Sequence, residues 1–292
     1  MNWINSLQVA IQYIEDHLLE SMTMEQIAAE SHISPFHFQR TFALLTDVTV
    51  AEYIRRRRLT LAAHELLQSD HKIIDLALKY GYDTPESFSK AFQRQHGMAP
   101  SEARKKRSSV QSYNRLVIQV SLKGAEPMKY KIVERPEFTI VGVKQAFSYV
   151  DGEHLQGIGK MWQEAWTSGT EDRLFELNNG EIPGLLGVVV DQSEIKDKQL
   201  EYWIATTYDG EIPEGLSSFT MPASQWSVFE VEGPMPESMQ LLWKRIISEW
   251  FPSNPYEHAF MPELEVYPGP NQPPQIWIPI QYISIVSNSI PS

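Results

Sequence analysis

One local pattern occurs twice in the chain, as HISPFHFQRTF from His32 to Phe42 and as YDTPESFSKAF from Tyr82 to Phe92. Each copy places a hydroxyl residue directly before a proline, which is a typical start of a helix. The hydroxyl oxygen accepts from a free backbone N–H of the first turn, and proline has no N–H to lose there. Each copy then spaces two phenylalanines four residues apart, so both lie on one face of the helix. The pattern predicts two helices that each bury an aromatic stripe.

A shorter helix is predicted before each copy. In TMEQIAAES, Thr23 and Gln26 have the spacing of a capping box, and Ile27-Ala28 follow. DHKIIDLALKYG places Leu76-Ala77 at the matching position of the second copy. A short helix, a tight turn and a capped second helix form a helix-turn-helix. A single copy would be equally typical of an αα-hairpin in a bundle, whereas two matching copies favour DNA binding.

Composition divides the chain into two parts. A length of 292 residues is typical of about two domains. Residues 1–107 carry 13 Lys/Arg and 13 Asp/Glu, whereas the remainder carries the whole net charge of −12 and seven of the eight tryptophans. The change falls near SEARKKRSSVQSYN, a basic, Ser-rich stretch. We therefore expect a domain over 1–107, a linker over 108–127 and a second domain over 128–284.

Several protein classes are excluded or disfavoured. The chain has no cysteine, which excludes disulfides and thiolate metal sites, and we expect no metal and no cofactor. Its opening residues are acidic and show no basic region of a signal peptide. The stretch from Val266 to Ser292 has no charged residue, but its six prolines argue against a spanning helix. We expect a soluble cytoplasmic protein without membrane contact.

A long helix is predicted in VAEYIRRRRLTLAAHELLQS, between the two copies. Arg55–Arg58 cover every side of such a helix, so some of them must pair with internal acids such as Asp75 or Glu65. The others can contact phosphates or remain solvated.

The faces opposite the phenylalanine stripes are suited to contacts with base edges. Arginine can pair with guanine, glutamine with adenine and glutamate with cytosine N4, and helix starts and hydroxyls can bind phosphates. The residues that we expect to contact DNA are Phe36, Gln39, Arg40, Thr84, Glu86, Ser87, Ser89 and Lys90.

Residues 5–107 resemble the AraC/XylS-type DNA-binding domain. The resemblance rests on Ile27-Ala28, the first capped helix, YIRRRRL, GYDTPESFSKAF and GMAPSEAR. It implies that two helix-turn-helix units, joined by a linker helix, enter adjacent major-groove segments of double-stranded DNA. One subunit could then bind an asymmetric site, with RNA polymerase as a candidate further partner.

The second domain alternates strands and helices. Strands are predicted in RLVIQVSLKG, MKYKIVE, FTIVGVKQAF, GLLGVVVD and LEYWIATTY, with a helix in HLQGIGKMWQEAWTSG before the last two. The order then repeats as strand WSVFEVEG, helix MPESMQLLWKRIISEWF and strands ELEVYPG and QIWIPIQYI. The predicted fold class is therefore α+β with two domains: an all-α double helix-turn-helix domain, then a pseudo-symmetric tandem βαββ domain.

Residues 128–280 resemble the GyrI-like effector-binding domain, through IVGV, LLGVVVD, EYWIATTY and PELEVYPG. The resemblance implies a cleft with aromatic walls and one acid, and its Glu-x-Tyr pattern corresponds to Glu265 and Tyr267. A partly buried glutamate there needs a counter-charge, and aromatic walls favour cations. Both Glu263 and Glu265 could equally be solvated. The candidate wall residues, each of which could instead be core, are Tyr149, Trp162, Trp166, Trp203 and Trp277.

Together these patterns predict a ligand-responsive, DNA-binding transcription regulator that is not an enzyme. Its effector would be a small organic molecule, such as a cation. Two alternatives stay open: a hydrolase of strained cyclic molecules that uses Glu265 and Tyr267, and a protein-binding module that docks a partner such as polymerase or gyrase.

Overall fold

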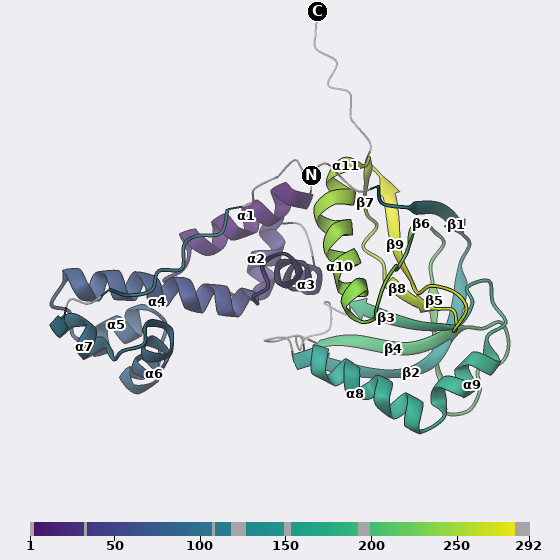
Figure 1. Ribbon diagram of the computed structural model, residues 1–292, viewed down its shortest axis with the longest axis horizontal. Coiled ribbons are helices and arrows are strands. Elements are labelled where there is room, and N and C mark those ends of the chain that lie inside the picture. Colours follow the sequence, from purple (N-terminus) through teal and green to yellow (C-terminus); the bar gives the residue numbers. More distant parts are fainter. Residues whose placement is uncertain are drawn as a thin grey trace, which may run out of the picture. The chain divides into compact units, whose positions relative to one another are not determined.

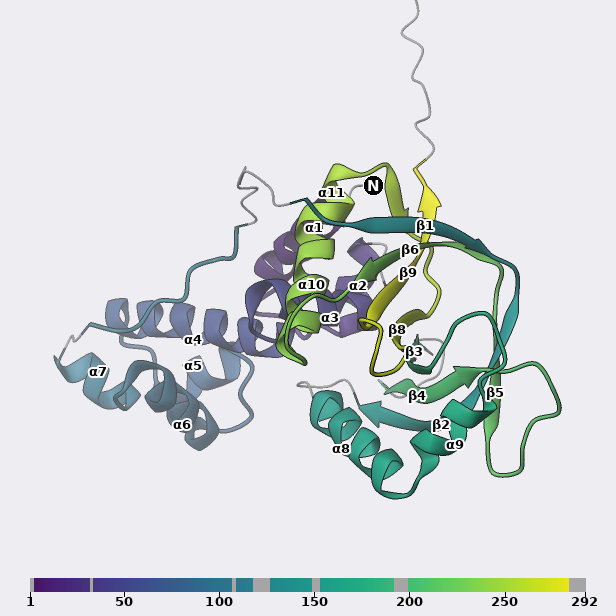
Figure 2. The same ribbon diagram turned by 45° about the vertical axis from the view of Figure 1, so that its right-hand side comes forward.

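The computed structural model describes residues 3–31, 34–106, 109–117, 127–148, 153–191 and 199–283 (Figure 1). The chain divides into two compact units, Trp3–Leu122 and Lys123–Ser292. The first unit consists of helices, and the second of an antiparallel sheet with helices on it (Figure 2). This is the α+β two-domain class that the sequence predicts.

The first unit contains both predicted helix-turn-helix motifs. Its helices are α1 (Trp3–Asp16), α2 (Met24–Ser31), α3 (Pro35–Thr46), α4 (Val50–Gln68), α5 (Ile73–Lys79), α6 (Pro85–His96) and α7 (Pro100–Lys106). Ser34 caps α3 by accepting from the backbone N–H of His37, and Thr84 caps α6 by accepting from that of Ser87. Thr23 and Gln26 also form the predicted capping box.

Each helix-turn-helix has a hydrophobic cluster of its own. Phe38 and Phe42 are fully buried in the first cluster, with α1 and α2, and Phe88 and Phe92 in the second, with α5. Leu61 of α4 packs against both clusters. The two phenylalanine pairs therefore form the buried stripes that their spacing predicts, and α4 is the helix shared by both motifs.

The arginine row of α4 is held by partners inside the first unit. Arg55 and Arg56 pair with Glu52, and Arg57 pairs with Glu15 at 2.8 Å. Arg58 donates to the backbone oxygens of Leu18 and Glu20, at 2.6 and 2.7 Å. The row joins α4 to α1 and to the turn after it.

These partners differ from those expected of the arginine row. Glu65, an expected partner, instead accepts from Lys79 Nζ at 2.7 Å and from the hydroxyl of Tyr80. Asp75, the other expected partner, lies in the first turn of α5, where an acid suits the helix dipole. Arg55 and Arg56 stay partly exposed, with 40% and 32% of their side chains accessible, so their contact with phosphates stays a prediction.

Glu15 is the acid around which α1 and α4 meet. Both of its oxygens accept from Arg57, at 2.8 Å, and Oε1 also accepts from the hydroxyl of Tyr53. Burial by itself raises the pKa of Glu15, but the bonds from Arg57 and Tyr53 outweigh it and leave that pKa below its usual value. The ionised carboxylate is therefore the form that stabilises this unit.

Residues 109–117, which fall in the expected linker, pack along the first unit. Val110 packs against the second cluster and Leu116 against the first. The strand predicted in RLVIQVSLKG does not form over 115–117, and its remainder lies outside the described residues. Leu116, which the alternating pattern would place on one face of a strand, packs instead against the helices of the first cluster. We call residues 109–117 the strap.

The second unit is a single antiparallel sheet with helices. The strands are β1 (Tyr130–Arg135), β2 (Phe138–Ser148), β3 (Leu185–Asp191), β4 (Gln199–Thr207), β5 (Ser217–Met221), β6 (Ser224–Glu230), β7 (Tyr256–His258), β8 (Glu263–Tyr267) and β9 (Gln275–Tyr282). The helices are α8 (Glu153–Thr167), α9 (Thr170–Leu177), α10 (Glu237–Arg245), a π-helical turn over Ile246–Trp250, and α11 (Phe251–Ser253). The sequence patterns did not predict α9, β5 or β7.

The strand order confirms the tandem βαββ prediction. It runs β1-β6-β9-β8-β3-β4-β2-β5, with β7 also paired to β9. The halves β2-α8-β3-β4 and β6-α10-β8-β9 therefore form mirrored strand triplets, which the antiparallel β3–β8 pair joins at the centre. The flanking strands exchange halves, because β1 pairs with β6 and β5 pairs with β2.

The sheet has two distinct faces. The core face carries the main hydrophobic cluster of this unit, with Val188, Trp203, Leu264 and Trp277 among its members. The opposite face, which we call the helix face, meets α8 and α10. Side chains alternate between faces along a strand, so neighbours of these core residues point to the helix face. β9 takes up part of the uncharged C-terminal stretch, and no helix in the described part of the chain has the length and apolarity needed to cross a membrane.

The pair between Glu15 and Arg57 predicts a pH-dependent stability. Replacing Glu15 by Gln removes the charge from a largely buried ion pair, so the wild type should be more stable by about 3 kcal/mol near neutral pH. Because the folded-state pKa of Glu15 is lowered, this difference is complete above the ordinary value near 4.5 and disappears as the pH falls through the folded-state value. Urea unfolding followed by helical circular dichroism at pH 7 and at pH 3 measures it. An equal difference at both pH values would contradict the prediction.

Candidate functional site

The outward face of α6 presents the predicted DNA-contacting side chains. Thr84, Glu86, Ser87 and Lys90 are exposed, and Ser89 is half-buried. They lie opposite the buried phenylalanine pair of the same helix. The face combines hydroxyls at the helix start with one acid and one base further along.

The corresponding face of α3 is less open. Gln39 and Arg40 are half-buried, and Gln39 Nε2 reaches the carbonyl oxygen of Pro35 at 3.4 Å. Phe36, expected on the outward face, is only 3% exposed, and its ring meets that of His37 edge-on. Phe36 belongs to neither hydrophobic cluster of the first unit, and its contact with DNA stays a prediction.

On the helix face of the second unit, Glu265 accepts two hydrogen bonds. β8 buries Leu264 and Val266 on the core face, which leaves Glu265 and Tyr267 together on the other. Trp243 of α10 donates Nε1–H to Glu265 Oε1 at 2.9 Å, and the hydroxyl of Tyr267 donates to Oε2 at 3.0 Å. The expected counter-charge is thus replaced by two neutral donors.

Helix α8 adds a second tryptophan to this group. Trp162 donates Nε1–H to the hydroxyl of Tyr202 at 2.9 Å, and its ring stands at 72° to that of Tyr267 with centroids 5.3 Å apart. Gly187 lies opposite Glu265 in the β3–β8 pair, and a Cβ there would come within 2.4 Å of the Tyr202 hydroxyl. A side chain at position 187 would therefore displace the Tyr202 hydroxyl. We call Trp162, Tyr202, Trp243, Glu265 and Tyr267 the aromatic–acid cluster.

The hydroxyl of Tyr267 stays protonated. Burial raises its pKa well above the usual value, and the neighbouring Glu265 and Tyr202 raise it further. Tyr267 therefore acts as a hydrogen-bond donor to Glu265 and not as a base.

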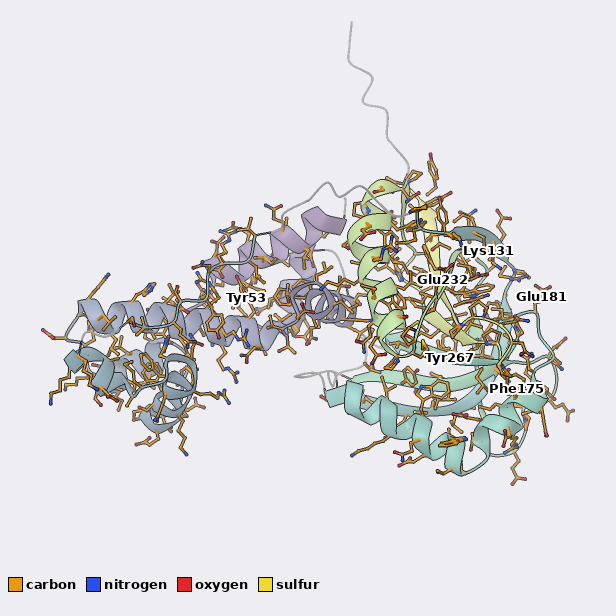
Figure 3. All side chains as sticks on the ribbon, in the orientation of Figure 1. Tyr53, Lys131, Phe175, Glu181, Glu232 and Tyr267 are labelled. Carbon is orange, nitrogen blue, oxygen red and sulfur yellow. The ribbon has the colours of Figure 1, made fainter. Side chains whose placement is uncertain are left out.

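A pocket of about 450 Å³ adjoins the cluster at Tyr267. Its other walls are Glu171, Asp172 and Phe175 of α9, the start of β3, and the proline-rich turn after β8 (Figure 3). Burial, and then Asp172, raise the pKa of Glu171 above its usual value. The pocket thus joins aromatic and proline surfaces to two acids.

The remaining predicted wall residues lie elsewhere. The core face carries Trp203 and Trp277, which belong to the main hydrophobic cluster. Their neighbours Tyr202 and Ile276 point to the helix face, and Ile276 is the register partner of Glu265. Placing the two tryptophans in a ligand site was wrong. Trp166 is 72% exposed on α8, one turn beyond Trp162. Tyr149 lies outside the described residues.

Two family models match the chain. Residues 131–280, more than half of its length, match the model of an integron-associated effector binding protein. Residues 11–106 match the model of a helix-turn-helix domain. Regulatory protein SoxS of Escherichia coli strain K12 is 37% identical over 98 residues, which make up 34% of this chain and 92% of SoxS.

The chain belongs to the AraC-type regulators. Its first unit is their helix-turn-helix domain, and its second is a GyrI-like effector-binding domain. YbfP of Bacillus subtilis strain 168, an uncharacterized HTH-type transcriptional regulator, is 42% identical over 100 residues. These residues make up 34% of this chain and 34% of YbfP. The structure of SAV2435 bound to tetraphenylphosphonium is similar to this chain with a TM-score of 0.47 and 23% identity, over 53% of this chain and 94% of that one.

Sequence patterns missed three members of the site in the GyrI-like domain. Trp243 and Tyr202 were interpreted only as parts of a helix and a strand, and Gly187 was not singled out. The alternation of side chains along β4 places Tyr202 and Trp203 on opposite faces, so one of the two had to lie on the helix face. The bond from Trp243 to Glu265 has no local signal, because it joins residues of different elements.

Glu265→Gln should destabilise the GyrI-like domain. A side-chain amide offers one acceptor where two donors point, so either Trp243 or Tyr267 loses its partner, at a cost of about 1–3 kcal/mol. Urea unfolding followed by tryptophan fluorescence measures this, because seven of the eight tryptophans lie after residue 107. Glu176→Gln, at an exposed position of α9, is the matched control. Equal stability of the two variants would mean that Glu265 is not held by these bonds.

Proposed function

We propose that this AraC-type regulator is a ligand-responsive transcription regulator that binds DNA through both helix-turn-helix motifs and a small organic cation through its GyrI-like domain. The observation that supports cation binding is the aromatic–acid cluster of the GyrI-like domain. On this proposal the protein acts in the cytoplasm, where it reaches DNA, and RNA polymerase is a further proposed partner.

The outward residues of α6 support sequence-specific contact with DNA. Glu86 and Lys90 are exposed one turn apart, which suits base edges in the major groove, and the hydroxyls of Thr84 and Ser87 at the helix start suit a phosphate. On α3 we propose that Gln39 and Arg40 have the corresponding roles. Since both motifs share α4, one chain can engage two adjacent groove segments.

The chemistry of the cluster supports a cationic effector. One carboxylate and four aromatic side chains meet there, and none of the five residues is Lys or Arg. An organic cation gains both from the negative charge and from ring faces. The pocket beside Tyr267 adds Glu171 and Asp172 without adding a basic side chain.

The same geometry gives little support to the hydrolase alternative. Both oxygens of Glu265 accept hydrogen bonds, and the raised pKa of Tyr267 keeps its hydroxyl protonated. A general base or nucleophile would need one of these groups ready to accept a proton or attack. The arrangement is better suited to holding a ligand than to reacting with it.

Lys90→Ala should weaken binding to a specific duplex and relax the choice of base at one position. A lost base contact costs about 1–3 kcal/mol, which is roughly a 5- to 150-fold loss in affinity. A 24-base-pair duplex selected from a random library by the wild type is titrated at fixed salt, and one scrambled duplex serves as the reference. Lys129→Ala removes the same charge from an exposed site in the GyrI-like domain and should have no effect. An equal loss for both duplexes would make Lys90 a phosphate contact.

Trp162→Leu should weaken cation binding, because it removes a ring from the cluster and a donor from Tyr202. Trp166→Leu, on the exposed part of the same helix, should leave binding unchanged. Calorimetric titration with the tightest binder from a panel of quaternary ammonium and aromatic amine cations measures both variants, and an uncharged isostere of that binder tests the charge. We expect at least a tenfold difference between the variants. Equal affinities, or equal binding of the isostere, would contradict the proposed site.

A further inference from the structure

The strap touches both helix-turn-helix motifs of the AraC-type domain. Val110, near its start, packs against the second hydrophobic cluster, which contains Phe88 and Phe92 of α6. Leu116, near its end, packs against the first cluster, which encloses α3, and its backbone N–H donates to the hydroxyl of Tyr53 at 3.1 Å. Exposed residues such as Gln111 lie between these anchors. The strap thus runs beside α4 from one motif to the other.

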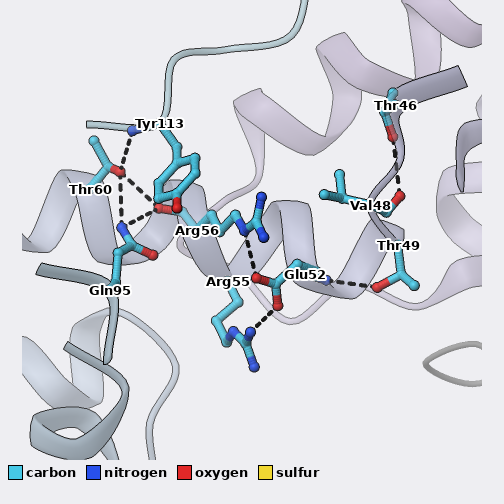
Figure 4. Close-up of polar contacts among 9 residues, drawn as sticks. All are labelled: Thr46, Val48, Thr49, Glu52, Arg55, Arg56, Thr60, Gln95 and Tyr113. Carbon is cyan, nitrogen blue, oxygen red and sulfur yellow. Dashed lines mark hydrogen bonds and ion pairs between the residues drawn. The ribbon is translucent and has the colours of Figure 1, made fainter. Parts of the chain in front are cut away.

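Thr60 of α4 is the hydrogen-bond centre of this contact (Figure 4). Its side chain is 1% exposed. The hydroxyl donates to the carbonyl oxygen of Arg56 at 2.8 Å and accepts from Gln95 Nε2 at 3.3 Å and from the backbone N–H of Tyr113 at 3.1 Å. One buried hydroxyl therefore ties the linker helix, α6 and the strap together.

Tyr113 adds two more contacts to α4. The guanidinium carbon of Arg56 lies over the ring of Tyr113, 4.8 Å from the ring centroid. The carbonyl oxygen of Tyr113 also accepts from Arg57 at 2.6 Å. Gln95 Nε2 also reaches the carbonyl oxygen of Arg56 at 3.1 Å. Arg57 in turn pairs with Glu15 of α1, so the network extends from α6 across the strap and α4 to the first motif.

We infer that Thr60, Gln95 and Tyr113 are positioning residues that fix the distance and rotation between the two recognition helices, α3 and α6. The inference rests on the proposed DNA-binding function. None of the three needs to touch DNA, because they act through the orientation of α6. The chain should therefore discriminate between DNA sites by the spacing of their two half-sites, in addition to their bases.

The geometry of DNA makes spacing a sensitive readout. One added base pair moves a half-site by about 3.4 Å along the axis and rotates it by about 35°, since a turn of ~34–36 Å contains ~10–10.5 base pairs. If α3 and α6 are held rigidly, they cannot follow that change, and one of the two helices no longer fits its major-groove segment. A pair joined only by α4 can follow part of it by bending.

The experiment compares a selected 24-base-pair duplex with the same duplex carrying one base pair inserted between its half-sites. The ratio of the two dissociation constants is the spacing penalty. It is measured on the full chain for the wild type, Thr60→Val and Thr60→Ser, because valine keeps the shape of threonine without the hydroxyl and serine keeps the hydroxyl. Tyr113→Ala and Tyr113→Phe form a second pair, in which only phenylalanine keeps the ring over Arg56. The rate of tryptic cleavage after Arg115 reports release of the strap.

We expect Thr60→Val and Tyr113→Ala to speed the cleavage and to lower the spacing penalty at least threefold, and the Ser and Phe variants to keep most of the wild-type penalty. An unchanged penalty in a folded variant overturns the inference, whether or not the strap is released. So does an equal loss of affinity for both duplexes, which would make the network a matter of stability alone. If the wild type selects no duplex at all, the proposed DNA-binding function fails instead.

Discussion

A polar group that leaves water needs a hydrogen-bond partner, and this constraint decides how both units of the chain are built. In the AraC-type domain, it draws Arg57 onto Glu15 and joins Thr60 to Gln95 and the strap. In the GyrI-like domain, it places the indole N–H of Trp243 on Glu265. Each of these bonds connects separate elements and helps to hold them together, while apolar packing supplies most of the stability.

Features of the fold that depend on short-range signals could be predicted from the sequence. Ser34 and Thr84 cap their helices as expected, because an N-cap involves only neighbouring residues. The paired phenylalanines of α3 and α6 are buried because helical spacing alone puts them on one face. The tandem βαββ order was also predictable, since the alternation of strands and helices repeats along the second half of the chain. Even the shared face of Glu265 and Tyr267 follows from the period of a strand.

What depends on register or on distant pairing could not be predicted in the same way. Trp203 and Trp277 lie on the core face because of how β4 and β9 align with their neighbours, and the sequence contains no local mark of that alignment. Arg57 and Arg58 of α4 have partners in α1 and in the turn after it, far away in sequence. The strap has the alternating pattern of a strand, yet Leu116 packs against the helices of the first cluster. In each case a nonlocal contact overrides or completes the local preference.

A ligand-responsive regulator requires that effector binding and DNA binding are coupled. The most direct measurement is a thermodynamic cycle on the whole 292-residue chain. DNA affinity is measured with and without saturating cation, and cation affinity is measured with and without the selected duplex. Linkage requires the two affinities to change by the same factor, which for coupled sites is typically ~5- to 150-fold. We predict equal factors different from one. A DNA affinity that does not change at saturating cation, in a chain that binds both ligands, would contradict this coupling.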